Sequence, residues 1–308
     1  MQTLESLHRH IETTVDLRTI VKTMKTLAAV SIHQYESAGE ALADYAGTVE
    51  MGLQVILRQH KALLNGESET CCSAAVILGS DHGLCGRFNE ELVRFVTQQL
   101  LCCGQSLSQV PMLVVGAKVA AKLEAHGGVA DPVLTWPGNV EGLTETVQSL
   151  LIRLDTMLAL RPGARILIFH NRRSEDVAAQ PLMTQLLPLD KAHLLGVVRR
   201  PWPSRCLPTF TMAFERLFAA LVRQHLFVAL FKAAAESVAS EQASRLLAMQ
   251  AAERNIEQHL DEVNAEYRMQ RQQQITDEII DVLSGFEAIA ADTEAAHAEA
   301  VSVPLSEL

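Results

Sequence analysis

The sequence predicts an α/β fold, in which a Rossmann-like α/β domain is inserted between long N- and C-terminal helices that pair as an antiparallel coiled coil. Apolar residues recur every three to five positions along both ends of the chain, which is typical of long amphipathic helices. Between these ends, short apolar runs alternate with helical stretches, which is typical of a sheet flanked by helices. An aromatic content of 5% argues in addition against an all-β fold.

The first section, residues 1–65, is predicted to be the N-terminal helix. Its apolar stripe begins at Leu4, passes through Ile20 and Val49 and reaches Ile56, and no proline interrupts it. A helix over residues 2–62 would be about 90 Å long, which is more than an ordinary domain accommodates. The section is therefore expected to pair with another helix in a coiled coil.

The middle section, residues 66–206, is predicted to be the α/β domain. Apolar runs predict strands, amphipathic stretches predict helices, and Gly, Asn or Asp follows each strand. Alternating strands and helices imply a sheet with helices packed on it. The predicted strands are residues 74–78, 112–115 and 165–169, and the predicted helices are roughly 88–102, 117–126 and 140–160.

The last section, residues 207–308, is predicted to be the C-terminal helix, unbroken from residue 209 to about 290. Gly285 is its only glycine, and no proline occurs between Pro208 and Pro304. Such a helix would be about 120 Å long, so the N-terminal helix cannot cover all of it without an offset. Part of its apolar stripe therefore needs another partner. No Lys or Arg follows Arg271, whereas eight acidic residues do, which predicts an acidic, solvated end.

Composition excludes several classes of function. The net charge of -10 argues against binding to nucleic acid or to anionic lipid surfaces. Charged residues near the N-terminus exclude the apolar core of a signal peptide. Five charged residues within 210–239 argue against a membrane-spanning helix there. The six cysteines lack zinc-finger spacing and are expected to be free thiols in a reducing compartment.

The most conspicuous local motif is the run Ser80-Asp81-His82-Gly83-Leu84-Cys85-Gly86-Arg87-Phe88-Asn89, which follows a predicted strand and precedes a predicted helix. That placement suits a phosphate-binding turn, but the spacing fits neither GxGxxG nor GxxxxGK[ST]. The favoured interpretation is a tight structural turn that needs glycine. An alternative is that Cys85 is a nucleophile with His82 as its base.

The remaining candidates give no sign of a catalytic, cofactor or metal site. His8 and His10 lie two positions apart on a helix, so they face different sides and make a poor pair of metal ligands. Arg172-Arg173 and Arg199-Arg200 are either a basic patch or simply solvated surface. No paired carboxylates and no Ser/His/Asp arrangement stand out.

Three motifs resemble the gamma-subunit family of F-type, rotary ATP synthases. Residues 20–29, IVKTMKTLAA, resemble the family pattern I-x-K-A-M-x-x-V-A-A, and residues 80–89 resemble T/S-D-R-G-L-C-G-G-x-N. Residues 236–249, ESVASEQASRLLAM, resemble E-x-x-A-S-E-x-x-A-R-M-x-A-M, followed by RQQQITDEI at 271–279. Their order and spacing cover the whole chain.

The resemblance implies that the paired helices are a rotating shaft inside a hexamer of alpha and beta subunits, and that the α/β domain is part of a foot on the membrane ring of c subunits beside the epsilon subunit. It implies a peripheral, non-catalytic subunit without a cofactor on the cytoplasmic face of the cell membrane. By the same resemblance, Leu84, Cys85 and Gly86 match a turn of the foot, and the positions expected to contact beta are Met24, Arg245, Arg271, Gln272, Thr276 and Glu278.

The chain also departs from the family pattern. Ile32, His33 and Gln34 replace part of a basic run, and His82 and Arg87 replace the usual Arg and Gly of the turn. These departures indicate a divergent branch, such as the alternative F-type ATPases thought to move sodium. Two other classes of function stay open on the residues alone, namely a nucleotide-binding α/β enzyme and a coiled-coil tether without a rotary role.

Overall fold

The computed structural model describes residues 3–59, 74–160, 163–174 and 176–301. The chain forms two compact units, one of Met1–Lys22 with Ala251–Leu308 and one of Thr23–Gln250. Two helices, α1 (Leu4–Ala41) and α7 (Phe214–Val301), contribute residues to both units. The predicted division into three consecutive sections stays a prediction, and its first boundary lies outside the described residues.

The larger unit contains a five-stranded sheet with β1 in its centre. The strand order is β3-β2-β1-β4-β5, with every pairing parallel except that of β5 with β4. The chain adds β2 and β3 on one side of β1 and then β4 and β5 on the other side, and this order is typical of Rossmann-like folds. The strands are β1 (Ala74–Leu78), β2 (Met112–Val115), β3 (Ala130–Leu134), β4 (Ile166–Arg172) and β5 (Gln180–Leu187).

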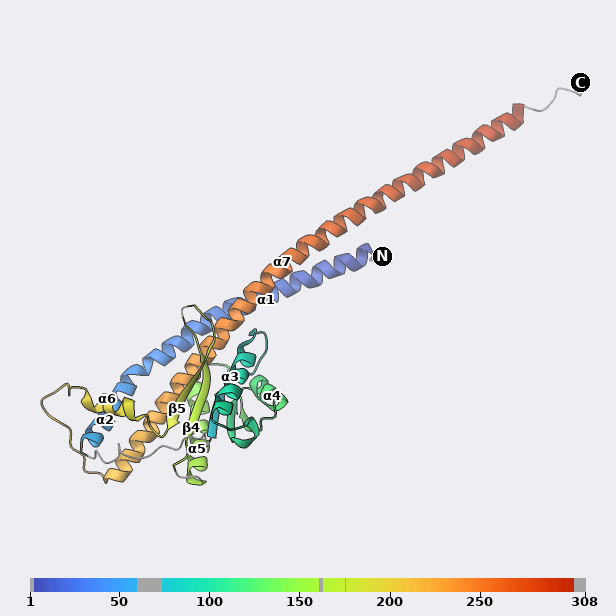
Figure 1. The fold of residues 1–308 in the computed structure, drawn as a ribbon. Helices are drawn as coiled ribbons and strands as arrows, with labels where there is room; N and C mark the ends of the chain where they lie inside the picture. The colour runs from blue at the N-terminus through green and yellow to red at the C-terminus, as the bar shows by residue number, and fades with distance from the viewer. Residues whose placement is uncertain (1–2, 60–73, 161–162, 175, 302–308) are drawn as a thin grey trace, which may run out of the picture. The chain divides into compact units, whose positions relative to one another are not determined.

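Helices cover both faces of this sheet, because alternate residues of the buried strands point to opposite sides. On β1, Ala75 and Ile77 pack against α3 (Phe88–Cys102) and α4 (Ala117–Ala125). Val76 and Leu78 of the same strand pack in a second core with α5 (Leu143–Leu160) and α7. Figure 1 shows α7 passing along the sheet on the side of β4 and β5. The sheet therefore lies between two apolar cores.

Within this unit, α1 and the next helix, α2 (Ala43–Gln59), run antiparallel to α7. The ideal Cβ position of Gly39 lies 3.6 Å from the Cβ of Ala235, and Tyr45 donates a hydrogen bond of 2.8 Å to Gln224. The short helix α6 (Lys191–Arg199) packs on α2, where Leu53, Leu57 and Leu194 form a small core. The N-terminal helices α1 and α2 are thus already paired with α7 within the unit that contains the sheet.

The smaller unit consists of the beginning of α1 and the C-terminal part of α7. The rings of His8 and Tyr267 lie 6.1 Å apart, and the rings of His10 and His259 lie 5.2 Å apart, so the two helices run antiparallel. Buried side chains along the seam include Leu7, Leu260 and Val263. Beyond the N-terminal end of α1, α7 continues alone (Figure 1).

The predicted fold class is confirmed, and four elements have the predicted bounds to within one residue. The predicted helix over residues 2–62 differs, since α1 ends at Ala41 and α2 begins at Ala43. Beyond this point α2 packs on α7 and α6, with Gly52 close to Leu221 and Leu53 and Leu57 in one core with Leu194. The strands β3 and β5 and the helix α6 were not predicted.

One segment of the described chain, Phe214–Glu287 of α7, is long and apolar enough to cross a membrane by length and composition alone, with a mean hydropathy of 1.4 in its most apolar window. By length and hydropathy, therefore, the five charged residues within 210–239 do not exclude a membrane-spanning helix. Leu226, Leu230 and Ala234 of the segment are buried in the core beside the sheet, which gives its apolar residues a structural role.

Candidate functional site

The turn after β1 is held by a compact hydrogen-bond network. The Ser80 amide donates to Oδ1 of Asn89 at 3.1 Å, and the Asn89 side-chain amide donates to the Ser80 hydroxyl at 2.7 Å. Both residues are buried, so each polar group needs such a partner. Leu84 has a φ of 64° and Gly86 a φ of 59°, and left-handed backbone is unusual for leucine. The network therefore holds a strained turn with Leu84 60% exposed at its tip.

Asp81 joins this turn to two other loops. Its carboxylate accepts hydrogen bonds from the Ala117 amide at 2.9 Å and the Trp136 amide at 2.5 Å. The Trp136 indole donates to the Gly79 carbonyl at 2.6 Å. The carboxyl ends of β1, β2 and β3 are thereby tied together, which the sequence alone did not reveal.

Three buried polar side chains of α7 lie at the end of β1 and at the turn that follows it. Ser237 donates a 3.0 Å hydrogen bond to the carbonyl of Leu78, at the end of β1. Arg245 forms an ion pair of 2.6 Å with Glu241 and donates to the Gly83 carbonyl at 3.4 Å. All three side chains are buried, and burial raises the pKa of Glu241 to about 7 although the Arg245 guanidinium lowers it. Two of the three motifs in the resemblance therefore meet in one network.

The alternative in which Cys85 is a nucleophile finds no support here. Burial raises the pKa of the Cys85 thiol, and the hydrogen bond with Ser80 offsets this only in part. The sulfur lies 3.7 Å from the Ser80 hydroxyl and 3.8 Å from the His82 carbonyl, whereas His82 itself is exposed. A buried neutral thiol held by these groups packs the turn and is poorly suited to nucleophilic attack.

The alternative of a nucleotide-binding enzyme meets a geometric obstacle. Rossmann-like sheets bind nucleotides beyond the carboxyl ends of the strands, where the connections diverge, and here that is the junction of β1 and β4. Ser237 bonds the end of β1, and the buried His170 of β4 lies 3.0 Å from Glu236 of α7. Helix α7 thus takes up polar groups at this junction that a ligand would use.

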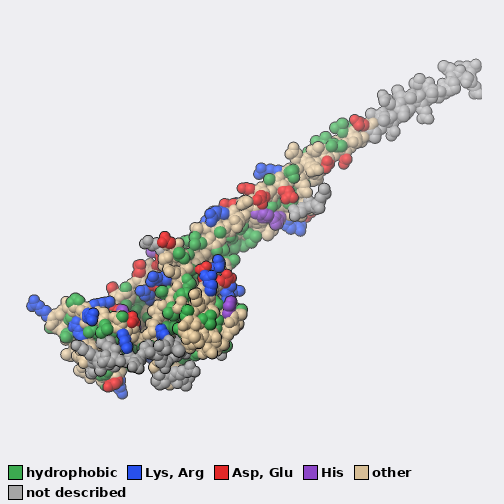
Figure 2. All heavy atoms as spheres, in the orientation of Figure 1, with side chains coloured by type: hydrophobic (Ala, Val, Ile, Leu, Met, Phe, Trp, Pro, Cys, Tyr) green, Lys and Arg blue, Asp and Glu red, His purple; other side chains and the backbone are tan. Residues whose placement is uncertain are grey.

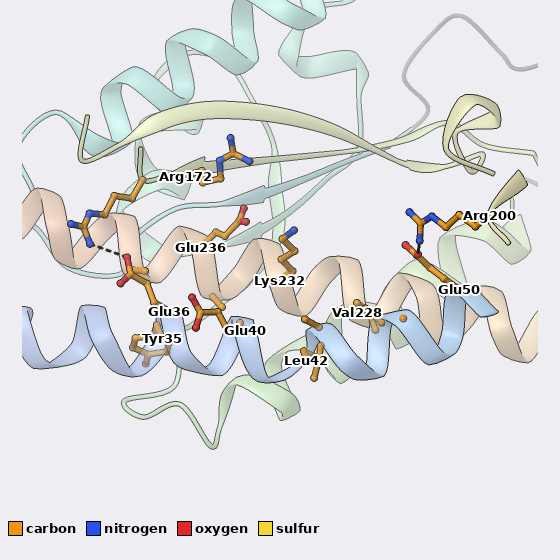
Figure 3. A pocket seen from close by; sticks show the side chains of 17 residues that line it. Tyr35, Glu36, Glu40, Leu42, Glu50, Arg172, Arg200, Val228, Lys232 and Glu236 are labelled. Carbon is orange, nitrogen blue, oxygen red and sulfur yellow. Dashed lines mark hydrogen bonds and ion pairs between the residues drawn. The ribbon is translucent and has the colours of Figure 1, made fainter. Parts of the chain in front are cut away.

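His170 and Glu236 form a second buried polar contact between the sheet and α7. Burial raises the pKa of Glu236, but the hydrogen bond and charge of His170, with Lys232 and Arg172 nearby, hold it below the ordinary value. Figure 3 shows Glu236 and Lys232 projecting from α7 toward the strands. No local sequence pattern indicates this contact, because its two partners lie far apart in the chain.

Three of the four arginines considered as a basic patch line one cavity of about 680 Å³ between α1, α2 and α7. Arg173 pairs with Glu36 at 2.9 Å, and Arg200 faces Glu50 at 2.5 Å (Figure 3). Arg172 and the carboxylate of Glu40 also line the cavity. Because glutamates pair with the arginines, the cavity does not have the positive charge that nucleotide phosphates favour.

The other predicted site residues lie on the C-terminal part of α7. Arg271, Gln272, Thr276 and Glu278 are all exposed. The Thr276 hydroxyl bonds to the Gln272 carbonyl at 2.8 Å, and Glu278 accepts from Gln274 at 3.1 Å. Arg271 and Glu278 line a shallow groove beside Leu4 and His8 of α1. Within the described residues, the side chains of Arg271 and Gln272 have no recorded hydrogen bond or ion pair, so their polar groups remain available to a partner.

Large apolar side chains surround these polar groups. Figure 2 shows hydrophobic and acidic side chains interspersed along this part of α7. An isolated soluble helix rarely exposes so many large apolar groups together, and such patches mark contact surfaces. The exposed fraction lies between 48% and 71% for Ile275, Ile279, Ile280, Val282, Leu283 and Phe286.

Met24 and Arg245 belong to the larger unit. Met24 is half-buried on α1. Arg245 is 8% exposed and directed at the chain's own turn. The structure thus brings Arg245 to the predicted turn of Leu84, Cys85 and Gly86, and gives it a contact that the motif alone did not indicate.

Comparison with known proteins identifies the family. Residues 3–289 match the family model described as ATP synthase. The ATP synthase gamma chain of Gluconobacter oxydans (strain 621H) is 28% identical, with 94% of this chain and 100% of that protein aligned. The gamma chain of Fuscovulum blasticum is 26% identical over the same shares.

Solved structures of rotor components share the fold. One is the central stalk and c-ring structure of Tetrahymena thermophila mitochondrial ATP synthase, with a TM-score of 0.57, 24% identity and coverage of 76% of this chain and 99% of that chain. Another is the OSCP/F1/c-ring structure of Euglena gracilis mitochondrial ATP synthase, with a TM-score of 0.63, 17% identity and coverage of 99% and 98%. The chain therefore belongs to the family of ATP synthase gamma chains.

Proposed function

We propose that this protein is the central-stalk gamma subunit of an F-type ATP synthase, in which it rotates as a shaft and couples ion flow to ATP synthesis or hydrolysis. The observation that carries this proposal is the C-terminal part of α7, where exposed polar groups such as those of Arg271 and Gln272 lie among exposed apolar side chains on a helix longer than its partner. Such a surface suits a bearing, because single polar contacts worth about 1 kcal/mol can form and break during rotation.

The proposed partners are the alpha and beta subunits around the shaft, and the epsilon subunit and membrane c ring at the foot. Family membership supports these assignments, and the related structures are described as a central stalk with its c-ring and as an assembly of OSCP, F1 and c-ring. The buried turn–α7 network supports the role of the α/β domain as a foot, since a foot that carries torque needs a firm attachment to the shaft.

We assign the subunit no catalytic residue. ATP synthase is an enzyme complex, and in this proposal the chemistry occurs on beta while gamma transmits torque. The buried Cys85 thiol and the glutamate-paired arginines support this assignment. The subunit would then be peripheral, on the cytoplasmic face of the membrane.

Arg271, Gln272, Thr276 and Glu278 are the proposed contacts to beta, and their exposure supports this role. Met24 and Arg245 remain weaker candidates for the same role, because both are at least partly covered by their own chain. The chain is proposed to divide into shaft residues 1–65 and 207–308 and foot residues 66–206. The transported ion, including the sodium suggested by the sequence departures, stays a prediction.

The proposal is tested by assembling the whole complex with Arg271→Ala combined with Gln272→Ala. We expect ATP-driven ion pumping in membrane vesicles to fall about thirtyfold, because two polar contacts of about 1 kcal/mol each are lost. The matched control is Arg94→Ala with Gln98→Ala, which removes the same two residue types from the exposed face of α3.

Pumping at the wild-type level in the Arg271/Gln272 double variant would contradict the assignment of these contacts. Failure of the wild-type chain to enter a complex with alpha and beta would contradict the shaft function itself and favour the coiled-coil tether.

A further inference from the structure

The smaller unit contains a pair of imidazoles that links its two helices. Nε2 of His10 on α1 lies 3.0 Å from Nε2 of His259 on α7, with the ring planes at 90°. Both residues are exposed, so solvent and small ions reach them. In the absence of an ion the contact is a hydrogen bond in which one imidazole donates and the other accepts, and this requires at least one neutral ring.

A carboxylate lies near one of the two rings. Nδ1 of His259 lies 3.8 Å from Oε2 of Glu262, one turn further along α7. A negative charge at this position favours the tautomer with the proton on Nδ1, which leaves a lone pair on Nε2. A carboxylate behind the imidazole is the usual outer partner of a metal-binding histidine. A lone pair on Nε2 of His259 can therefore serve as a metal ligand beside His10.

The spacing of the two nitrogens fits one transition-metal ion. Zinc binds imidazole nitrogen at about 2.0–2.1 Å, so two ligands at a tetrahedral angle are about 3.3 Å apart. An outward rotation of the exposed side chains by a few tenths of an ångström would give this separation. Within the described residues no group of three His, Cys, Asp or Glu side chains is placed to hold a metal, so water would complete the coordination.

We propose that His10 and His259 form a binding site for a divalent transition-metal ion such as Zn²⁺, which bridges α1 and α7. The bound ion replaces the hydrogen bond between the rings by two coordinate bonds and stabilises the helix pair against separation. With two protein ligands, the site binds zinc more weakly than a structural site with four. The inference is independent of the rotary function.

The test titrates Zn²⁺ into the metal-free full-length chain and follows binding by calorimetry and thermal unfolding by circular dichroism. We expect one zinc ion to bind at this site and to raise the unfolding temperature of the helix pair. His10→Gln and His259→Gln should each weaken binding at this site at least tenfold, because glutamine replaces a nitrogen ligand. His8→Gln is the matched control, since His8 lies on the same helix but faces Tyr267.

Equal zinc affinity in wild type and in either of the two ligand variants would overturn the site and indicate an adventitious ion only. Equal weakening in His8→Gln would overturn it as well. X-ray absorption of the zinc-bound wild type provides a measurement that needs no variant. Two imidazole nitrogens at about 2.0–2.1 Å are expected, and fewer than two would contradict the proposal.

Discussion

Two arginines on the same helix show how differently α7 uses one residue type. Arg245 is 8% exposed, paired with Glu241 and bonded to the turn after β1. Arg271 is exposed and has no recorded ion pair in the described part of the chain. The first ties the helix to its own domain, and the second is a proposed contact to beta. The same contrast separates the network around Ser237 from the surface around Ile279.

The largest effect on stability is expected from Arg245→Ala. This change leaves the buried Glu241 without its positive partner, and the loss of one member of a buried pair costs about 3 kcal/mol. The free energy of unfolding, measured by urea titration, should fall by this amount. Arg271→Ala is the control and should change it by less than about 0.5 kcal/mol. Equal losses in both variants would abolish the contrast between the two arginines.

A second effect concerns the pH dependence of Glu241. Its pKa is about 7 in the folded chain and about 4.5 when unfolded, so the folded state holds the extra proton between these values. The wild type should therefore gain stability as the pH falls from 8 to 5, by about 2 kcal/mol.

Glu241→Gln has no carboxylate to protonate at this position, so it should lack the stability gain that comes from Glu241 as the pH falls. Urea titrations of both proteins across the same pH range measure the difference. Parallel pH profiles would show that Glu241 stays ionised in the folded protein.

A smaller effect is expected from Ser237→Ala. The substitution removes the hydrogen bond to the Leu78 carbonyl and leaves that carbonyl in a buried site, at a cost of about 1 kcal/mol. Thermal unfolding provides the measurement. Thr276→Ala, which also removes a hydroxyl from α7 but at an exposed position, is the control and should melt close to the wild type. A larger loss for Thr276→Ala would show that the exposed surface is structural.

The smallest effect on stability is expected from the double variant Arg271→Ala and Gln272→Ala. Both side chains are exposed, and within the part of the chain that the structure describes neither forms a hydrogen bond or ion pair, so the free energy of unfolding of the isolated chain should change by less than about 0.5 kcal/mol. Its effect appears only in the assembled complex. If the double variant unfolds at a much lower temperature than the wild type, these residues stabilise the folded chain.

The sequence predicts elements well where burial is uniform. β1 and β2 are continuous apolar runs that are fully buried, and their bounds agree with the prediction. β3 contains Asp131 and Pro132 and lies at the sheet edge, where proline is tolerated, so it offered no apolar run. The apolar stripe continues past the end of α1 at Ala41, so local periodicity does not show this end.

The candidate site also contains residues that could be predicted from the sequence and contacts that could not. The residues proposed to contact beta came from the family resemblance, since an exposed Arg or Gln on a helix has no local pattern of its own. The contact of Arg245 with Gly83 joins residues 162 positions apart, and that of Ser237 with Leu78 joins residues 159 apart. His10 and His259 are 249 positions apart, whereas the local sequence pattern pairs His10 only with its neighbour His8.

The exposed apolar end of α7 also has a consequence for the protein before assembly. Ile279, Leu283 and Phe286 are exposed, so a newly made chain carries them in contact with water before it assembles. Such a surface favours self-association at high concentration and attracts chaperones that bind apolar segments. The cell therefore has reason to match the supply of this subunit to that of its partners, because any excess is a burden on protein quality control.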